Sequence, residues 1–259
     1  MPLYLCLVPN HGARIGHQSW EYIFLVNYCK KFGFFFVFHE FLSNSKTIGA
    51  VLQFDTINKY KFKDEFIQKM KRMSFKDLTT ANHEALIELN KFEENILLYD
   101  RIGGNEYFLK NLKYRMSSAE EQDMQKEYSL FFKNKYPRKV VGPYICFHIR
   151  RGDVVSRKGR CLDATYFIEK YKYLLEKIPE TNLPVYAITE QNFAEEDLLR
   201  EHIPDVNIIK GSEVDAFYYL VNSNYLIACG SGFSNLAHFL GSMKIIAPPG
   251  WRFLLHNRI

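Results

Sequence analysis

Apolar positions in the C-terminal half of this chain fall into short runs separated by stretches of helical periodicity. The runs occupy residues 144–149, 185–189, 206–209, 225–229 and 244–247. Between them, apolar residues recur three and four positions apart, which predicts helices over 163–177, 191–202, 213–222 and 235–241. Strands that alternate with helices are typical of parallel βαβ units. This half is therefore predicted to be a compact α/β unit.

The N-terminal part begins in the same way. The pattern predicts a strand over 3–8, a helix over 19–32 that stops at Gly33, and a second strand over 34–39. The stretch 55–135 is rich in Lys, Glu and Phe, and we expect it to be mostly helical.

A polar, basic and proline-containing passage at 134–142 separates the two parts. The chain is therefore predicted to be an α/β protein with two Rossmann-like domains, residues 1–140 and 141–259, that face a cleft. Clefts between domains are preferred places for ligand sites.

The composition is that of an ordinary globular protein. Of the 259 residues, 47% are hydrophobic and 24% are charged, which allows real cores. The net charge of +5 is spread along the chain without a basic tail. Such a charge does not indicate a nucleic-acid partner, and it suits a small anionic substrate.

The cysteines indicate reduced thiols, because their number is odd and no CxxC pair occurs. They are Cys6, Cys29, Cys146, Cys161 and Cys229. We expect no metal site. No apolar run approaches the about 20 residues that span a bilayer, and the N-terminus lacks the features of a signal peptide. A soluble, cytoplasmic protein is expected, complete or as a fragment of a larger or anchored one.

The run 144–149 ends abruptly in a polar and charged cluster of His148, Arg150, Arg151 and Asp153. In open α/β sheets, ligands bind outside the carboxyl ends of the strands. Arginine presents a rigid fork of donors suited to phosphate and keeps its charge at neutral pH. The segment therefore predicts an anion site, most simply for the phosphates of a nucleotide. The alternative is a solvated, salt-bridged loop.

A second candidate follows the run 225–229, where residues 229–235 read CGSGFSN. A turn of small residues between a strand and a helix exposes backbone N–H groups at the helix N-terminus, where phosphate binds readily. Ser231 and Ser234 add hydroxyls. The alternative is a simple helix cap formed by Ser234.

Other positions are weaker candidates, each with a structural alternative. Arg14 and His17 follow the first strand and are placed to reach the cleft, unless their loop is an ordinary turn. Thr189 and Glu190 end a strand at the same sheet edge, or are simply solvated there. Asp215 starts a helix, where a carboxylate also favours the helix dipole.

These segments, in this order, resemble the motifs of the GDP-fucose-dependent fucosyltransferases, which include the α1,2-, α1,6- and protein O-fucosyltransferases. HIRRGD (148–153) is similar to their central H-x-R-R-G-D signature, and SGFS (231–234) to their later S-x-F-S motif. Residues 13–33 and 186–198 resemble their N-terminal G-x-x-G-N-Q loop and an intervening strand. The resemblance implies the GT-B glycosyltransferase fold, with two Rossmann-like domains.

The chain departs from the family pattern at several positions. His17 stands where the family has an asparagine, and Ala13 where a glycine is common. Thr189 and Glu190 replace a Ser-Asp pair. These differences concern the acceptor and the subgroup more than the donor.

Carried over by position, the resemblance implies a GDP-fucose site in the domain 141–259. Arg150 is implied to hold the β-phosphate and stabilise the leaving group, while His148 and Arg151 shape the site. The remaining residues implied to contact the donor are Asp215, Ser231, Gly232, Phe233 and Ser234.

The resemblance further implies that the domain 1–140 faces the acceptor through a loop with Arg14, Gly16 and His17. Asp153 is implied to orient an arginine or to face the acceptor. Three residues remain open as the general base: Glu190, Asp153 and His17.

The implied reaction is an inverting, metal-independent transfer of L-fucose from GDP-fucose to a glycan, with an α1,2 bond to a galactose-type residue as one candidate linkage. The partners are then a nucleotide-sugar donor and a carbohydrate or glycoconjugate acceptor, and no cofactor is expected. Two alternatives stay open. One is a glycosyltransferase that uses another nucleotide sugar, and the other is a non-catalytic nucleotide- or glycan-binding protein.

Overall fold

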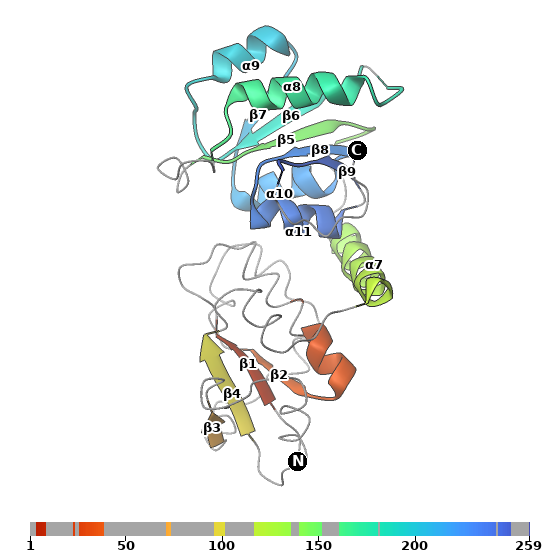
Figure 1. Cartoon of the computed structure of the whole chain (residues 1–259), viewed down its shortest axis with the longest axis vertical. Helices are drawn as coiled ribbons and strands as arrows, with labels where there is room; N and C mark the ends of the chain where they lie inside the picture. The colour runs from red at the N-terminus through yellow and green to blue at the C-terminus, as the bar shows by residue number, and fades with distance from the viewer. Residues whose placement is uncertain are drawn as a thin grey trace. The chain divides into compact units, whose positions relative to one another are not determined.

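The computed structural model consists of two compact units, Met1–Met124 and Gln125–Ile259. The residues that it describes are 4–8, 23, 26–38, 71–73, 96–101, 117–135, 140–151, 161–180, 182–241, 243–249 and 259 (Figure 1). The division between the units falls inside helix α7 (Ser118–Lys135), ahead of the passage 134–142 that the sequence suggests as a boundary.

The sheet of the second unit has five parallel strands in the order β7-β6-β5-β8-β9. Their bounds are Ile145–Ile149 for β5, Val185–Thr189 for β6, Asn207–Lys210 for β7, Tyr225–Ala228 for β8 and Lys244–Ile246 for β9. All five predicted strands are confirmed, and each end lies within one residue of its expected place.

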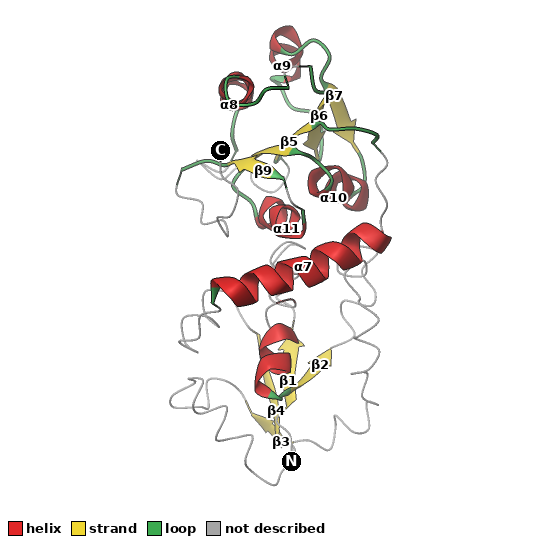
Figure 2. Ribbon diagram, turned by 90° about the vertical axis from the view of Figure 1, so that its right-hand side faces the viewer, coloured by secondary structure: helices red, strands yellow, loops and turns green. Residues whose placement is uncertain are grey.

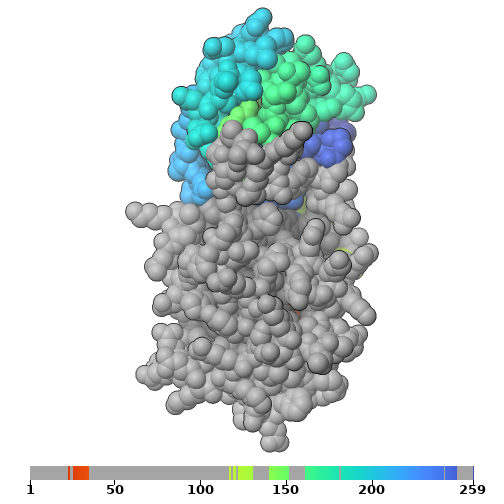
Figure 3. All heavy atoms as spheres, turned by 60° about the vertical axis from the view of Figure 1, so that its left-hand side comes forward, coloured from red at the N-terminus to blue at the C-terminus, as the bar shows by residue number. Residues whose placement is uncertain are grey.

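In the described part of this unit, α8 and α9 cover one face of the sheet, and α10 and α11 cover the other (Figure 1 and Figure 2). Their bounds are Ala164–Leu175 for α8, Glu196–His202 for α9, Glu213–Val221 for α10 and Gly232–Leu240 for α11. The four predicted helices are confirmed, but α9 begins five residues later than expected and α11 three residues earlier. Other residues of α8 and α9 than their buried ones contribute to the surface of the unit (Figure 3).

Burial on both faces explains why β5, β6 and β8 contain almost continuous apolar residues. All five residues of β5 are buried, and Phe147 is stacked on Phe167 of α8 with ring centroids 5.9 Å apart. Leu199 of α9 and Ile227 of β8 are fully buried in the same core. Each such side chain contributes about 1.5–3 kcal/mol when it leaves water.

The strand order creates a switch point between β5 and β8. From β5 the chain adds β6 and then β7 on one side, and it returns to add β8 and then β9 on the other side. Ligands of open α/β sheets bind where the strand order reverses in this way. The residues that follow the carboxyl ends of β5 and β8 are therefore those that the fold itself places at a ligand site.

The sheet of the first unit has four parallel strands in the order β2-β1-β4-β3. The predicted strands are confirmed as β1 (Tyr4–Val8) and β2 (Phe35–Phe38). The stretch 55–135 contains helix α7, but it also contributes β3 (Lys71–Met73) and β4 (Ile96–Arg101), which the mostly helical expectation missed.

The predicted helix stop at Gly33 is confirmed. Gly33 has a φ of 68°, and the N–H of Phe34 donates to the carbonyl of Cys29 over 3.0 Å. Phe34 is buried, and its ring lies 5.8 Å from that of Tyr28. This hydrogen bond and this contact are those of a Schellman C-cap, which favours glycine at the left-handed position.

Candidate functional site

The two strongest sequence motifs meet at the switch point. His148, on β5, lies with its Nδ1 2.5 Å from the Oγ of Ser234 and 3.3 Å from the Oγ of Ser231, both at the start of α11. Residues that are 86 and 83 positions apart in the chain are thus in direct contact. The fold therefore brings His148 of the HIRRGD segment and the two serines of the SGFS segment into one cluster.

His148 is the centre of this buried cluster. Its Nδ1 is surrounded by two hydroxyls and by the thiol of Cys229, whose Sγ lies 3.4 Å away. A lone pair on Nδ1 can accept from these groups, which favours the neutral tautomer that carries its proton on Nε2. Burial, and second the positive charge of Arg150, lower the pKa of His148 to about 3. His148 is therefore a neutral group near pH 7 and is unsuited to act as a general base with a pKa close to 7.

Cys229 belongs to the same cluster as a protonated thiol. Burial raises the pKa of Cys229 to about 11, although hydrogen bonds from Ser231 and Ser234 and the charge of Arg150 act in the opposite direction. A thiolate is the reactive form of cysteine, and little of it is present at neutral pH. The side chain serves here as a small buried group rather than as a nucleophile.

The N-terminus of α11 is capped by Ser231. Its backbone is extended (φ −145°, ψ 149°), and its Oγ accepts from the N–H of Ser234 over 3.1 Å. The alternative reading, in which Ser234 caps the helix, is wrong, because the hydroxyl of Ser234 lies against His148 instead. The nine-residue helix starts at Gly232, so the SGFS segment forms its cap and first turn. Backbone N–H groups and the helix dipole make such a turn suitable for an anion.

Phe233 closes one side of the cluster. Its ring lies 5.4 Å from the ring of His148 and 5.1 Å from that of Phe217 on α10. The aromatic ring thus shields the imidazole and joins the first turn of α11 to the neighbouring helix.

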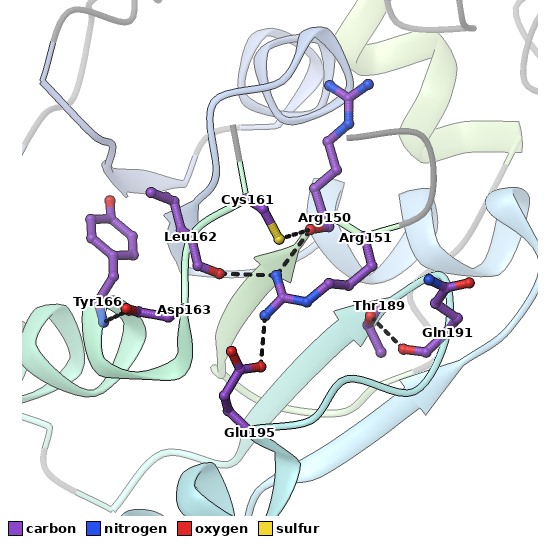
Figure 4. A network of polar contacts seen from close by, with 9 residues as sticks. All are labelled: Arg150, Arg151, Cys161, Leu162, Asp163, Tyr166, Thr189, Gln191 and Glu195. Atoms are coloured by element: carbon purple, nitrogen blue, oxygen red, sulfur yellow. Dashed lines mark hydrogen bonds and ion pairs between the residues drawn. The ribbon is translucent and has the colours of Figure 1, made fainter. Parts of the chain in front are cut away.

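Arg151 is fixed by a network of polar contacts with its own unit (Figure 4). Its Nη1 donates to the carbonyl oxygens of Arg150 (3.0 Å) and Leu162 (2.9 Å), and its Nη2 lies 3.4 Å from the Oε2 of Glu195. The guanidinium also lies over the ring of Phe193, 5.0 Å from its centroid. Arg151 is only 5% exposed.

Arg150 behaves differently from its neighbour. Its side chain is half-buried and extends away from the Arg151 network (Figure 4). Its positive charge lowers the pKa values of both His148 and Cys229, which shows that the guanidinium acts on the cluster at the switch point. Of the two arginines, Arg150 is the one whose charge acts on that cluster.

The weaker candidates lie at the same edge or on the neighbouring helix. Thr189 is buried and donates from its Oγ1 to the carbonyl of Gln191 over 3.0 Å, which stabilises the turn after β6. Glu190 is exposed. Asp215 lies in the first turn of α10, where its N–H and its carboxylate both bond to the Oγ of Ser212. These contacts give Asp215 a capping role in the helix.

Several predicted site residues lie outside the described residues. They are Arg14, Gly16, His17 and Asp153.

Three contributors to the Arg151 network were not identified from the sequence. Glu195 and Phe193 contact Arg151 from the loop between β6 and α9, which the sequence suggests to be part of a helix. The late start of α9 is what frees them for this contact. The third contributor is the backbone carbonyl of Leu162, which accepts from Arg151 and cannot be recognised from the type of its side chain.

Within the described ranges, no group of three or more His, Cys, Asp or Glu side chains is placed to hold a metal ion. In the same part of the chain, no helix has both the length and the apolar character needed to cross a membrane.

The sequence matches no protein-family model and no curated protein. Among solved structures, the fold is similar to that of a mutant of Arabidopsis thaliana FUT1 in complex with GDP, with a TM-score of 0.53 and 10% identity over 96% of this chain and 71% of that chain. Fucosyltransferase NodZ from Bradyrhizobium gives a TM-score of 0.47 at 15% identity, over 96% of both chains. The Escherichia coli heptosyltransferase WaaC with ADP-2-deoxy-2-fluoro heptose gives 0.49 at 11% identity, over 100% of this chain and 92% of that chain.

Of these three likenesses, that to FUT1 has a TM-score above 0.5, and at 10% identity it concerns the fold alone. The predicted α/β fold of the GT-B glycosyltransferase type, built on parallel sheets, is thereby confirmed.

Proposed function

We propose that this chain is a glycosyltransferase that transfers L-fucose from GDP-fucose to a glycan, with inversion and without a metal ion. The observation that carries the proposal is the contact between His148 and the start of α11 at the switch point of the sheet. It joins an arginine-bearing strand end to a helix N-terminus, and both features are suited to a diphosphate.

The chemistry of sugar transfer explains why such a site is effective. Transfer from a nucleotide diphosphate passes through an oxocarbenium-like state, as glycoside hydrolysis does, while negative charge builds on the departing diphosphate. Preorganised donors directed at that charge are usually the largest catalytic contribution. The guanidinium of Arg150 and the first turn of α11 would supply them without a metal ion.

The N–H groups available to the diphosphate can be named. The N–H of Ser234 donates to the Oγ of Ser231, and the N–H of Asn235 donates to the carbonyl of Ser231. Within the described part of the chain, this leaves the N–H groups of Gly232 and Phe233 at the open end of the helix. We assign them to the diphosphate together with Arg150.

The remaining roles follow from the resemblance to the GDP-fucose-dependent enzymes. His148 and Arg151 shape the donor site, and Asp215 lies on the side of the nucleotide. Arg14, Gly16 and His17 face a carbohydrate or glycoconjugate acceptor, with an α1,2 bond to a galactose-type residue as the candidate linkage. Asp153, Glu190 and His17 are the candidates for a general base. His148 is not a further candidate, because burial lowers its pKa to about 3.

The choice of GDP as the nucleotide rests on two supports. The HIRRGD and SGFS segments resemble the motifs of GDP-fucose-dependent enzymes, and the FUT1 structure of similar fold is a complex with GDP.

The test is turnover of GDP-fucose by the whole chain, with and without the Arg150→Ala substitution, over a panel of glycan acceptors in EDTA. By comparison with lost oxyanion donors, the substitution is expected to lower kcat by about 10²–10³-fold, or about 3–4 kcal/mol. Arg200→Ala is the matched control, because the guanidinium of Arg200 also donates to one carbonyl, that of Val206, and to one carboxylate, that of Glu196. Near-normal turnover in Arg150→Ala, or a strict requirement for a divalent cation, contradicts the proposal.

A further inference from the structure

Arg151 connects three parts of the chain at the carboxyl edge of the sheet. Its two Nη1 hydrogen bonds reach Arg150 at the end of β5 and Leu162 just before the N-cap of α8. Its Nη2 reaches Glu195, the residue that precedes α9. One guanidinium thus links the loop that follows β5 to the loop that follows β6.

The two carbonyls held by Nη1 stand at opposite ends of the segment 151–161. Arg151 and Leu162 are 11 positions apart in the chain, and their hydrogen bond closes this segment at its base. Cys161 supports the same closure, because its Sγ lies 3.8 Å from the carbonyl of Arg150. The carbonyl of Arg150 is therefore contacted by two groups, the guanidinium of Arg151 and the thiol of Cys161.

A fixed carbonyl at Arg150 restricts the backbone from which the side chain of Arg150 projects. The direction of a side chain follows from its backbone dihedrals and the rotamers they allow. A guanidinium is suited to this task, because its planar fork holds several acceptors in one rigid geometry. Lysine carries the same charge on a single nitrogen and cannot reproduce that geometry.

The burial of Arg151 argues against direct contact with a nucleotide. Only 6% of its side chain is exposed, and both hydrogens of Nη1 are used by carbonyls. A face of the guanidinium is covered by the ring of Phe193. A phosphate would have to displace these partners to reach it.

We propose that Arg151 is a positioning residue, whose guanidinium holds the Arg150 and Leu162 carbonyls together and so directs Arg150 toward the diphosphate without touching the donor itself. This inference rests on the proposed function, because it assigns the diphosphate as the ligand of Arg150. It separates the two adjacent arginines into one ligand and one support, although both carry the same charge.

The test is a double-mutant cycle of Arg150→Lys and Arg151→Lys, read as the dissociation constant of GDP for the whole chain. We expect Arg151→Lys to weaken GDP binding about tenfold when Arg150 is present, which corresponds to about 1.4 kcal/mol. With Arg150→Lys already in place, the same substitution should change binding by less than about twofold, because the guanidinium that Arg151 directs is no longer present. Losses that simply add would mean that Arg151 is an independent ligand, and would overturn the inference.

Arg200→Lys is the matched control, because it removes a comparable guanidinium with a carbonyl and a carboxylate partner. It should leave GDP binding unchanged and should not couple to Arg150→Lys. If Arg151→Lys does not fold, Arg151→Gln replaces it in the cycle, since its amide keeps two N–H donors.

Amide hydrogen exchange provides a measurement that does not depend on the nucleotide. Exchange at residues 150–151 and 161–162 should become faster in Arg151→Lys and remain unchanged in Arg200→Lys. If the unsubstituted chain binds no GDP, the proposed function fails and exchange alone decides the inference. Unchanged exchange in Arg151→Lys overturns the positioning role in either case.

Discussion

Two serine caps in the second unit allow the His148 cluster to be tested against a matched reference. Ser231 caps α11 and Ser212 caps α10, and in each helix the cap Oγ accepts from the N–H three residues later, over 3.1 Å and 3.2 Å. Ser212 is exposed, whereas Ser231 is 1% exposed. The substitutions Ser231→Ala and Ser212→Ala therefore remove the same cap in two different surroundings.

The loss of a serine cap costs about 1 kcal/mol of stability. Ser212→Ala should cost little more than this, because the other hydrogen bond of Ser212, to the carboxylate of Asp215, is exposed to water. The Oγ of Ser231 also lies 3.1 Å from the Oγ of Ser234 and 3.3 Å from the Nδ1 of His148. Removing it leaves buried polar groups with one partner fewer, which adds about 1–2 kcal/mol. We therefore expect Ser231→Ala to lower the free energy of unfolding by about 2–3 kcal/mol.

Urea unfolding followed by circular dichroism measures both variants, and both serines report on the same unit. The midpoint should fall further for Ser231→Ala while the dependence on urea stays unchanged. Equal losses for the two variants would refute the reasoning, because they would mean that the contacts of Ser231 with His148 and Ser234 contribute nothing.

Three further predictions concern single positions. The pKa of His148 in the folded chain is about 3, below its ordinary value of 6.5. Between these two pH values, the unfolded chain therefore binds one proton more at His148 than the folded chain does. Stability should therefore fall as the pH drops from about 6.5 towards 3, by up to about 1.4 kcal/mol per pH unit, and His148→Asn should flatten this dependence in acid unfolding curves. Gly241→Ala would place a Cβ 2.6 Å from the carbonyl oxygen of Val221, so it should cost about 1–3 kcal/mol in urea unfolding, and a loss below about 0.5 kcal/mol would contradict the close approach. Gly142 has a φ of 86°, so Gly142→Ala should cost about 1–2 kcal/mol although no atom lies within 4 Å of the added Cβ, and an unchanged midpoint would count against that backbone.

The strands of the second unit could be predicted from the sequence because helices cover both faces of their sheet. That burial produces continuous apolar runs such as 145–149, with polar residues directly after them. In the first unit, β3 (Lys71–Met73) has two basic residues and no apolar run, so nothing in its sequence marks it as a strand. It is formed by its pairing with β4, which is a property of the fold.

The candidate site was predictable to the level of its motifs. The resemblance to the GDP-fucose-dependent fucosyltransferases implies that His148, Ser231 and Ser234 belong to one donor site, and the structure brings these three residues into contact. The structural alternative, a helix cap at Ser234, names the wrong serine, because the weak helix propensity of glycine conceals a helix that starts at Gly232. The network of Arg151 depends on backbone carbonyls and on the start of α9, which no side-chain pattern encodes.

The most direct test of the account is calorimetric titration of the whole chain with GDP, UDP and ADP in the presence of EDTA, with Arg150→Ala measured alongside. The account predicts that GDP binds with a dissociation constant of about 1–10 μM, about 7–8 kcal/mol of binding free energy, and more tightly than UDP or ADP. In Arg150→Ala this binding should weaken by about a hundredfold, or about 2.7 kcal/mol. Absence of nucleotide binding would contradict the assignment of the switch point as a GDP-sugar site. So would a dissociation constant of GDP that Arg150→Ala leaves unchanged.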